Sequence, residues 1–89
     1  MACYIVSFEV SDPAKLNSLK EGLKSYGAYC PVNQGCWAIL SPKTHLEIRD
    51  HLSKLIDSTD RLFVVRSGTA AAWWNAYGPE NSEWLKKNL

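Results

Sequence analysis

The stretch CYIVSFEV at residues 3–10, with SDP directly after it at residues 11–13, decides how this 89-residue chain folds. One set of its alternate residues, from Tyr4 to Val10, is entirely apolar, which is typical of a strand that turns one face toward a layer of helices. Ser11 or Asp12 can cap a helix, and the proline that follows suits a first helical turn. The stretch therefore predicts a β-strand that leads at once into an α-helix.

The later segments continue in the order helix, hairpin, helix and strand. Leucines at helical spacing run from Leu16 to Leu23, and Gly27 ends the helix that they predict. The remaining elements are a hairpin at residues 28–32 and 35–40, a second helix that starts at the capping box Thr44-His45-Leu46-Glu47, and a fourth strand at residues 61–66. This βαββαβ order predicts an α+β protein of the ferredoxin-like kind, with two helices on one face of an antiparallel sheet.

We expect one domain, residues 1–89, made of a core at residues 1–67 and a C-terminal tail at residues 68–89. Within the tail, residues 69–74 are expected to form a short fifth strand and residues 79–87 a short helix. Four large aromatic residues crowd into this tail: Trp73, Trp74, Tyr77 and Trp84. A short tail cannot bury them alone, so we expect them to dock onto the domain or onto a second copy of it.

The composition narrows the class of protein. Ten Lys and Arg against nine Asp and Glu give a net charge of +1, which provides no bulk attraction to nucleic acid or to an anionic membrane. The three cysteines, Cys3, Cys30 and Cys36, follow no paired CxxC spacing, which favours reduced core thiols over a metal or redox site. No apolar run reaches the ~20 residues of a membrane span and no signal peptide is apparent, so we expect a cytoplasmic protein without membrane contact.

Several kinds of enzyme are not indicated. No serine lies in a Gly-x-Ser-x-Gly elbow, and the five glycines are too scattered to form a phosphate-binding loop. His45 and His51 are six residues apart, so they do not share a helix face as a metal-binding pair would. We expect no required cofactor.

Several short motifs together resemble a known superfamily. They are Phe8-Glu9-Val10 with Ser11-Asp12-Pro13, Tyr26-Gly27-Ala28, a strand around Trp37, Asp60-Arg61-Leu62-Phe63-Val64-Val65, and the tail segment Asn81-Ser82-Glu83-Trp84-Leu85-Lys86. Over nearly the whole chain, the sequence resembles SinR-like and VapD-like proteins, which are related to the small CRISPR-associated adaptation subunit. The resemblance implies a ferredoxin-like homodimer, often with a last strand that crosses to the partner's sheet edge. The interface residues would then be Ala70, Ala72, Trp73, Trp74 and Trp84.

Some members of this superfamily are metal-dependent nucleases, and the resemblance implies a site at the end of the first strand. Glu9 of each protomer would face its counterpart across the dimer axis and hold Mg²⁺, with Asp12 as a second acidic residue. The family usually has aspartate at the position of Glu9. The alternatives are that Glu9 is solvated or pairs with Arg61 or Arg66, and that Asp12 caps the helix that follows it.

Contact with RNA or DNA would need a local patch. The candidate phosphate-binding residues lie on the two predicted helices: Lys15, Lys20, Lys24, Arg49 and Lys54. The alternative is an ordinary solvated helix face. Trp37 and Tyr29 invite comparison with RNA-recognition sheets that stack bases on aromatic residues, but the aromatic signature of those domains is missing.

Three functional classes follow from these observations. The first is a small homodimeric, non-catalytic protein associated with nucleic acid. The second is a Mg²⁺-dependent phosphodiesterase of the endoribonuclease kind that uses paired Glu9. The third is a protein-interaction or regulatory subunit that docks through its aromatic tail.

Overall fold

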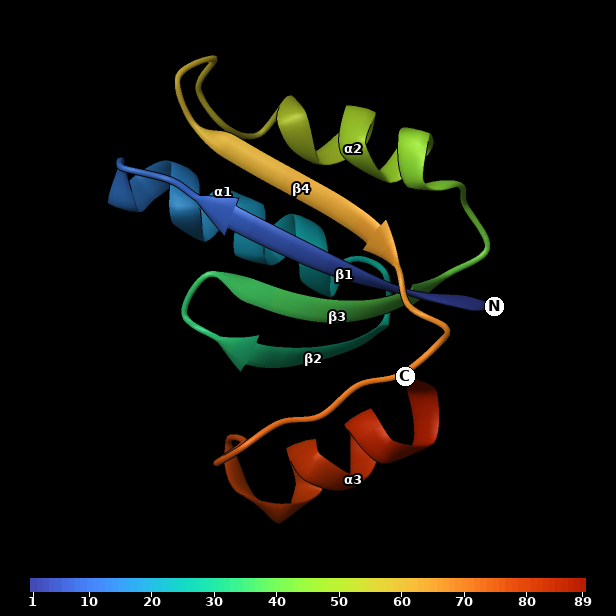
Figure 1. Cartoon of the computed structure of the whole chain (residues 1–89). Coiled ribbons are helices and arrows are strands. Elements are labelled where there is room, and N and C mark those ends of the chain that lie inside the picture. Colours follow the sequence, from blue (N-terminus) through green and yellow to red (C-terminus); the bar gives the residue numbers. More distant parts are fainter.

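The computed structural model describes all residues from 1 to 89 and contains one four-stranded sheet and three helices (Figure 1). The elements are β1 (Ala2–Glu9), α1 (Pro13–Lys24), β2 (Ala28–Asn33), β3 (Cys36–Ser41), α2 (His45–Ser53), β4 (Arg61–Arg66) and α3 (Gly78–Asn88). Every strand pairing is antiparallel, and the strand order is β2-β3-β1-β4. The predicted α+β class is confirmed, and the order is consistent with the ferredoxin-like βαββαβ arrangement.

The main core lies between the sheet and the pair α1 and α2, which sit behind the sheet in Figure 1. Its buried residues come from β1, β3 and these two helices: Tyr4, Val6, Phe8, Leu19, Leu23, Trp37, Ile39, Ile48 and Leu52. The apolar alternate residues of β1 thus face the helices, as their spacing predicts. Helix α2 covers β4, whereas α1 reaches β2, so two helices span the four strands.

The helix starts follow the predicted caps. Asp12 accepts a hydrogen bond through Oδ1 from the backbone N–H of Ala14 at 2.9 Å, which satisfies one of the free donors at the start of α1. At the start of α2, the N–H of Glu47 donates to Oγ1 of Thr44 at 3.2 Å, and the N–H of Thr44 donates to Oε1 of Glu47 at 3.1 Å. The predicted capping box is therefore confirmed.

The turn between β2 and β3 requires glycine because of a close approach to β1. A Cβ atom at Gly35 would lie 2.8 Å from the carbonyl oxygen of Phe8, a backbone atom that cannot move aside. The N–H of Phe8 also donates to the carbonyl oxygen of Gly35 at 2.8 Å. Gly35 therefore ties the hairpin turn to the central strand.

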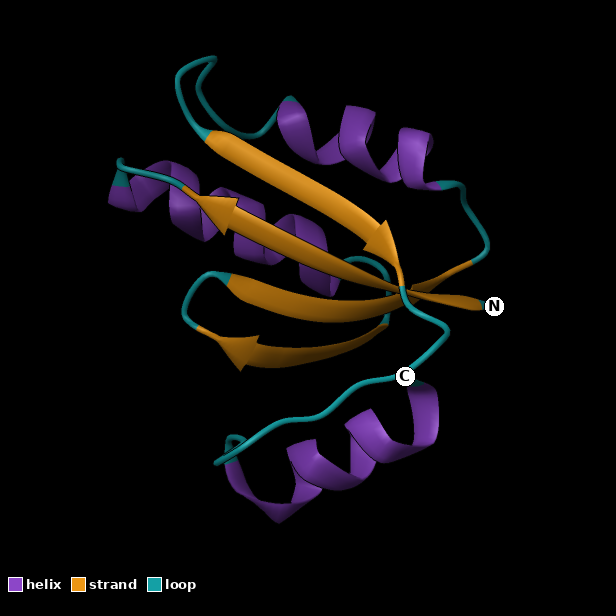
Figure 2. Cartoon of the chain, in the orientation of Figure 1, coloured by secondary structure: helices purple, strands orange, loops and turns teal.

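The expected fifth strand at residues 69–74 does not form, and the chain from residue 67 to residue 77 is drawn as loop in Figure 2. The segment runs toward β2, but the outer edge of β2 cannot accept another strand. Pro31 has no backbone N–H, and its carbonyl oxygen already accepts a hydrogen bond from Nδ2 of Asn81 at 3.1 Å. The run of alanines at residues 70–72 also has little preference for strand.

The predicted C-terminal helix is confirmed as α3, and it docks on the sheet face opposite α1 and α2. Leu85 of α3 is buried in a second cluster with Cys3, Cys30 and Ala38, and half-buried tail residues such as Trp73 pack against this cluster. The tail is therefore folded onto its own domain. No helix has the length and the apolar character needed to cross a membrane.

Candidate interaction surface

Glu9, the residue implied as a metal ligand, is held by a neighbouring strand. It lies opposite Arg61 in the β1–β4 register, and Nη1 of Arg61 donates to Oε1 of Glu9 at 2.6 Å. Both side chains are exposed. No group of three or more His, Cys, Asp or Glu residues in the chain is placed to hold a metal ion. The pairing with Arg61 is one of the two alternatives to metal binding that the sequence suggests.

The other acidic residues near this end of the sheet fix the loops. Asp12 caps α1, as described above. Asp60 accepts hydrogen bonds from the backbone N–H of Ser11 at 3.3 Å and from that of Asp57 at 2.9 Å, and Asp57 forms an ion pair with Lys15. These carboxylates therefore hold the loop before β4 against the start of α1.

The candidate phosphate-binding residues are spread over α1 and α2 among acidic neighbours. Lys15 forms an ion pair with Asp57. Nζ of Lys24 lies 3.9 Å from Oε2 of Glu21. Nη2 of Arg49 lies 2.9 Å from Oδ1 of Asp50. Lys20 and Lys54 form no ion pair. The helix faces therefore carry charges of both signs and do not form a continuous basic patch.

The two aromatic residues that would stack RNA bases lie on the helix side of the sheet. Trp37 is buried beneath the helices, and Tyr29 stacks on it with 5.5 Å between the ring centroids and 22° between the rings. Neither ring is presented on a free sheet face. The sequence shows that aromatic residues are present in these strands but not which face they occupy.

The residues expected at a dimer interface fall into two groups within one chain. Trp73 and Trp84 are half-buried against the second core cluster, and Nε1 of Trp73 donates to Oγ of Ser82 at 3.2 Å. By contrast, Ala70 and Ala72 are exposed, and the side chain of Trp74 is 95% exposed. Of the tail tryptophans, only Trp74 extends freely into solvent.

The edge of β4 is open along its whole length, which sequence reasoning missed. The N–H of Ser67 donates to the carbonyl oxygen of Cys3 at 2.9 Å, which continues the β1–β4 register. Because backbone groups of an antiparallel pair point alternately toward and away from the neighbour, those of Leu62, Val64 and Arg66 point away from β1. Three N–H and three C=O groups are thus left without a strand neighbour. The sequence signal for this surface was the run Leu62-Phe63-Val64-Val65, which places apolar side chains on both faces of the strand.

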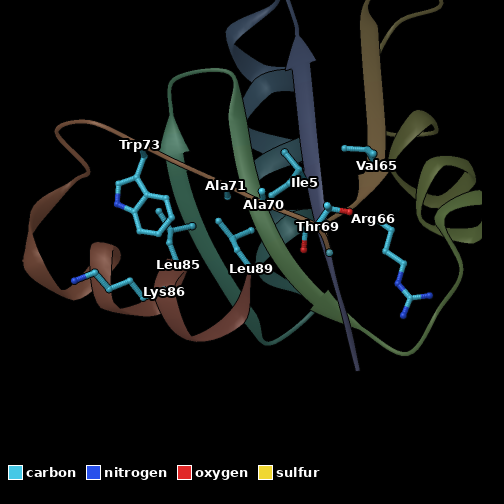
Figure 3. Close-up of a pocket in the computed structure, with 12 residues that line it drawn as sticks. Ile5, Val65, Arg66, Thr69, Ala70, Ala71, Trp73, Leu85, Lys86 and Leu89 are labelled. Atoms are coloured by element: carbon cyan, nitrogen blue, oxygen red, sulfur yellow. The ribbon is translucent and has the colours of Figure 1, made fainter.

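The open sheet face over β4 is the least covered part, because the cluster under α3 includes Cys30 of β2, Ala38 of β3 and Cys3 of β1 but no residue of β4. Its apolar residues remain accessible: Phe63 is 63% exposed and Val65 is 42% exposed, beside half-buried Ile5. A cleft of about 540 Å³ separates this part of the face from the tail and α3 (Figure 3). A second hollow of about 650 Å³ lies at the other end, around Ser7 and Phe63.

The buried thiols do not add a reactive group to these surfaces. Burial raises the pKa of Cys3, Cys30 and Cys36 above the ordinary value of 9.0, so all three are neutral thiols near pH 7.

The fold and its surfaces define an α+β protein with one open sheet edge and one half-covered sheet face. Comparison with models of known protein families finds no match for the sequence.

Proposed function

We propose that this protein is a small homodimeric interaction subunit in which two copies join through their β4 edges. The observation that carries this proposal is the open edge of β4, with the exposed side chains of Phe63 and Val65 beside it. An open edge with apolar side chains is a template for pairing with another strand. A second copy satisfies its backbone groups and covers part of its apolar surface.

The β4 sequence suits pairing with itself. The antiparallel registers that pair the outward backbone groups of both copies include one centred on Phe63 and one centred on Val64. In the first, Phe63 meets the partner's Phe63, and in the second it meets the partner's Val65. Cross-strand apolar pairs of this kind contribute roughly 0.2–1 kcal/mol each. Neither register places two arginines directly opposite each other.

The other sheet edge explains why assembly would stop at two copies. Pro31 interrupts the N–H groups of the β2 edge, and Asn81 covers the carbonyl oxygen of that proline. Only β4 can therefore accept a strand. Pairing of like edges about a two-fold axis forms a closed dimer with a continuous sheet of eight strands, and no edge remains for a fibre.

The two other functional classes have less support. Contact with nucleic acid would have to come from helix faces on which Lys15, Lys24 and Arg49 already have acidic partners. A Mg²⁺-dependent phosphodiesterase would need Glu9 to leave Arg61 in both copies. The resemblance to SinR-like and VapD-like proteins supports a homodimer in any of the three classes. In the present proposal β4, rather than residues 70–74, makes the dimer contact.

Light scattering on purified variants tests the proposal. The wild-type chain should have twice the 10.0 kDa mass of one copy. Val64→Pro removes an outward N–H and should give a monomer with unchanged circular dichroism, because the hydrogen bonds to β1 remain. Ala72→Pro is the matched control, since it would break an exchanged tail strand but not the β4 contact. A monomeric wild type, or a dimer lost with Ala72→Pro and kept with Val64→Pro, would overturn the proposal.

A further inference from the structure

We infer that the β4 edges of two copies pair in the register centred on Phe63, where Asp60 of each copy forms an ion pair with Arg66 of the other. The inference identifies the contact that fixes the register of the dimer, and it rests on the homodimer proposed above. Asp60 directly precedes β4, and Arg66 is the last residue of that strand. The strand therefore carries opposite charges at its two ends.

Both charges are available to a partner. Neither Asp60 nor Arg66 forms an ion pair within the chain. Oδ1 of Asp60 accepts a hydrogen bond from the N–H of Ser11, and Oδ2 accepts one from the N–H of Asp57. Because an ionised carboxylate has about four acceptor sites, each oxygen can accept a further bond. The exposed side chain of Arg66 extends away from the tail and α3 in Figure 3.

The two charged side chains lie on the same face of the sheet. Arg66 is opposite Tyr4 in the β1–β4 register, and Tyr4 is buried beneath the helices, so Arg66 turns toward the side of α1 and α2. Asp60 comes an even number of positions earlier and is hydrogen-bonded to Ser11 and Asp57, in the segments that adjoin those helices. Since directly opposite residues of an antiparallel pair share a face, the two side chains can meet across an interface.

Two registers pair the longest stretch of β4 with itself. The register centred on Phe63 pairs residues 61–65 of both copies, and the register centred on Val64 pairs residues 62–66. A register centred nearer either end of the strand pairs a shorter stretch and leaves more backbone groups without a partner. The choice between the two longest registers then depends on which side chains they bring together.

The register centred on Phe63 matches charge with charge and apolar with apolar. It places Asp60 directly opposite the partner's Arg66, and the two-fold axis repeats this contact at the other end. Between these ends, Leu62 meets the partner's Val64. In the register centred on Val64, Arg66 meets the partner's Leu62 instead, so a charged side chain lies against an apolar one. Opposite residues interact more closely than diagonal ones, which favours the first register.

The other face of the sheet supports the same register. Phe63 is 63% exposed in one chain, and this register places it against the partner's Phe63 at the two-fold axis. The two rings can then cover each other. Because the backbone groups of Phe63 point toward β1, the two residues form a pair without mutual hydrogen bonds, with Cα atoms ~4.5 Å apart.

Disulfide trapping on the full chain distinguishes the two registers. Phe63→Cys places two thiols at this close pair, within the range of a disulfide, whereas the register centred on Val64 separates them diagonally by ~7–8 Å. Val64→Cys is the matched control, because its thiols lie opposite each other only in that second register. Diamide serves as the oxidant and non-reducing electrophoresis as the readout, with the wild type as the control for the native thiols. We expect a covalent dimer with Phe63→Cys and none with Val64→Cys.

Charge reversal tests the ion pair itself. Arg66→Glu places two carboxylates together at each end of the interface and should raise the dissociation constant of the dimer at least roughly tenfold, measured by analytical ultracentrifugation. Lys87→Glu is the matched control, because Lys87 is exposed on α3 and forms no ion pair. Added salt should weaken the wild-type dimer and strengthen that of Arg66→Glu, since it screens attraction in one and repulsion in the other.

The outcomes separate this inference from the dimer proposal. A covalent dimer with Val64→Cys, alone or as readily as with Phe63→Cys, would overturn the register and leave the β4 dimer intact. Equal effects of Arg66→Glu and Lys87→Glu would overturn the ion pair alone. A monomeric wild type, or a dimer in which neither cysteine variant forms a cross-link, would overturn the β4 contact and the inference together.

Discussion

Glu9 on β1 and Arg61 on β4 lie opposite each other on neighbouring strands, and Oε1 of Glu9 is 2.6 Å from Nη1 of Arg61. The antiparallel register brings the two residues together although 52 positions separate them in the sequence. Both side chains are largely exposed, so water screens their attraction. The pair therefore marks the end of the open sheet face without contributing much to stability.

Substitution of Glu9 tests whether this carboxylate is structural or binds metal. Glu9→Gln should change the free energy of unfolding by less than about 1 kcal/mol, because exposed ion pairs contribute little. Addition of Mg²⁺ should leave the thermal unfolding midpoint of the wild type unchanged. Calorimetry with Mg²⁺ or with a chelator measures both effects. A midpoint that rises with Mg²⁺ in the wild type but not in Glu9→Gln would restore the metal site.

Gly35 should be sensitive to a single added methyl group. Gly35→Ala places a Cβ against the carbonyl oxygen of Phe8, and the backbone must shift to relieve the contact. We expect a loss of about 1–3 kcal/mol in the free energy of unfolding, measured by urea denaturation. Gly68→Ala is the control, because no atom lies within 4 Å of the added Cβ. Equal stability of the two variants would contradict the close approach.

Leu85 should hold α3 on the sheet. Leu85→Ala removes a side chain that is only 2% exposed and should cost about 2–5 kcal/mol in the free energy of unfolding. The exposed Leu46→Ala serves as the control and should change it by less than ~0.5 kcal/mol. Because α3 covers Cys30, the variant should also speed reaction of this thiol with a colorimetric thiol reagent. An unchanged thiol reaction rate would mean that α3 does not protect the cysteine.

The thiols predict how stability depends on pH. Burial raises the pKa of Cys3, Cys30 and Cys36 in the folded state. The unfolded chain therefore loses these protons at lower pH than the folded chain, so the free energy of unfolding should fall as pH rises above 9.0. Urea denaturation between about pH 8 and about pH 10 measures the slope. Cys30→Ala should flatten it, and a rising curve in the wild type would contradict the burial of the thiols.

The sheet and its helices could be predicted from sequence because their signals are local. The alternation in residues 3–10, the Thr44–Glu47 capping box and the apolar run at residues 61–66 each identify an element without knowledge of its neighbours. The assignment of the apolar set of β1 to the helix side also follows from alternation alone. These expectations agree with the structure.

The tail and the open edge depend on contacts between distant residues, which local patterns do not reveal. The expected strand at residues 69–74 does not form within the single chain, where Pro31 and Asn81, on other elements, close the nearby edge of β2. The sequence alone left several possible surroundings for the Glu9 side chain. The β1–β4 register places Arg61 directly opposite it. The free edge of β4 follows only from the strand order.

Amide hydrogen exchange at β4 tests the central claim most directly, because it reports on the backbone groups that would join two copies. The amides of Phe63 and Val65 point toward β1 and should be protected at every protein concentration. The amides of Leu62, Val64 and Arg66 should be protected when the protein is concentrated and should lose that protection on dilution. Protection of these three amides that does not depend on concentration, or exchange as fast as in an open loop at high concentration, would contradict the β4 dimer.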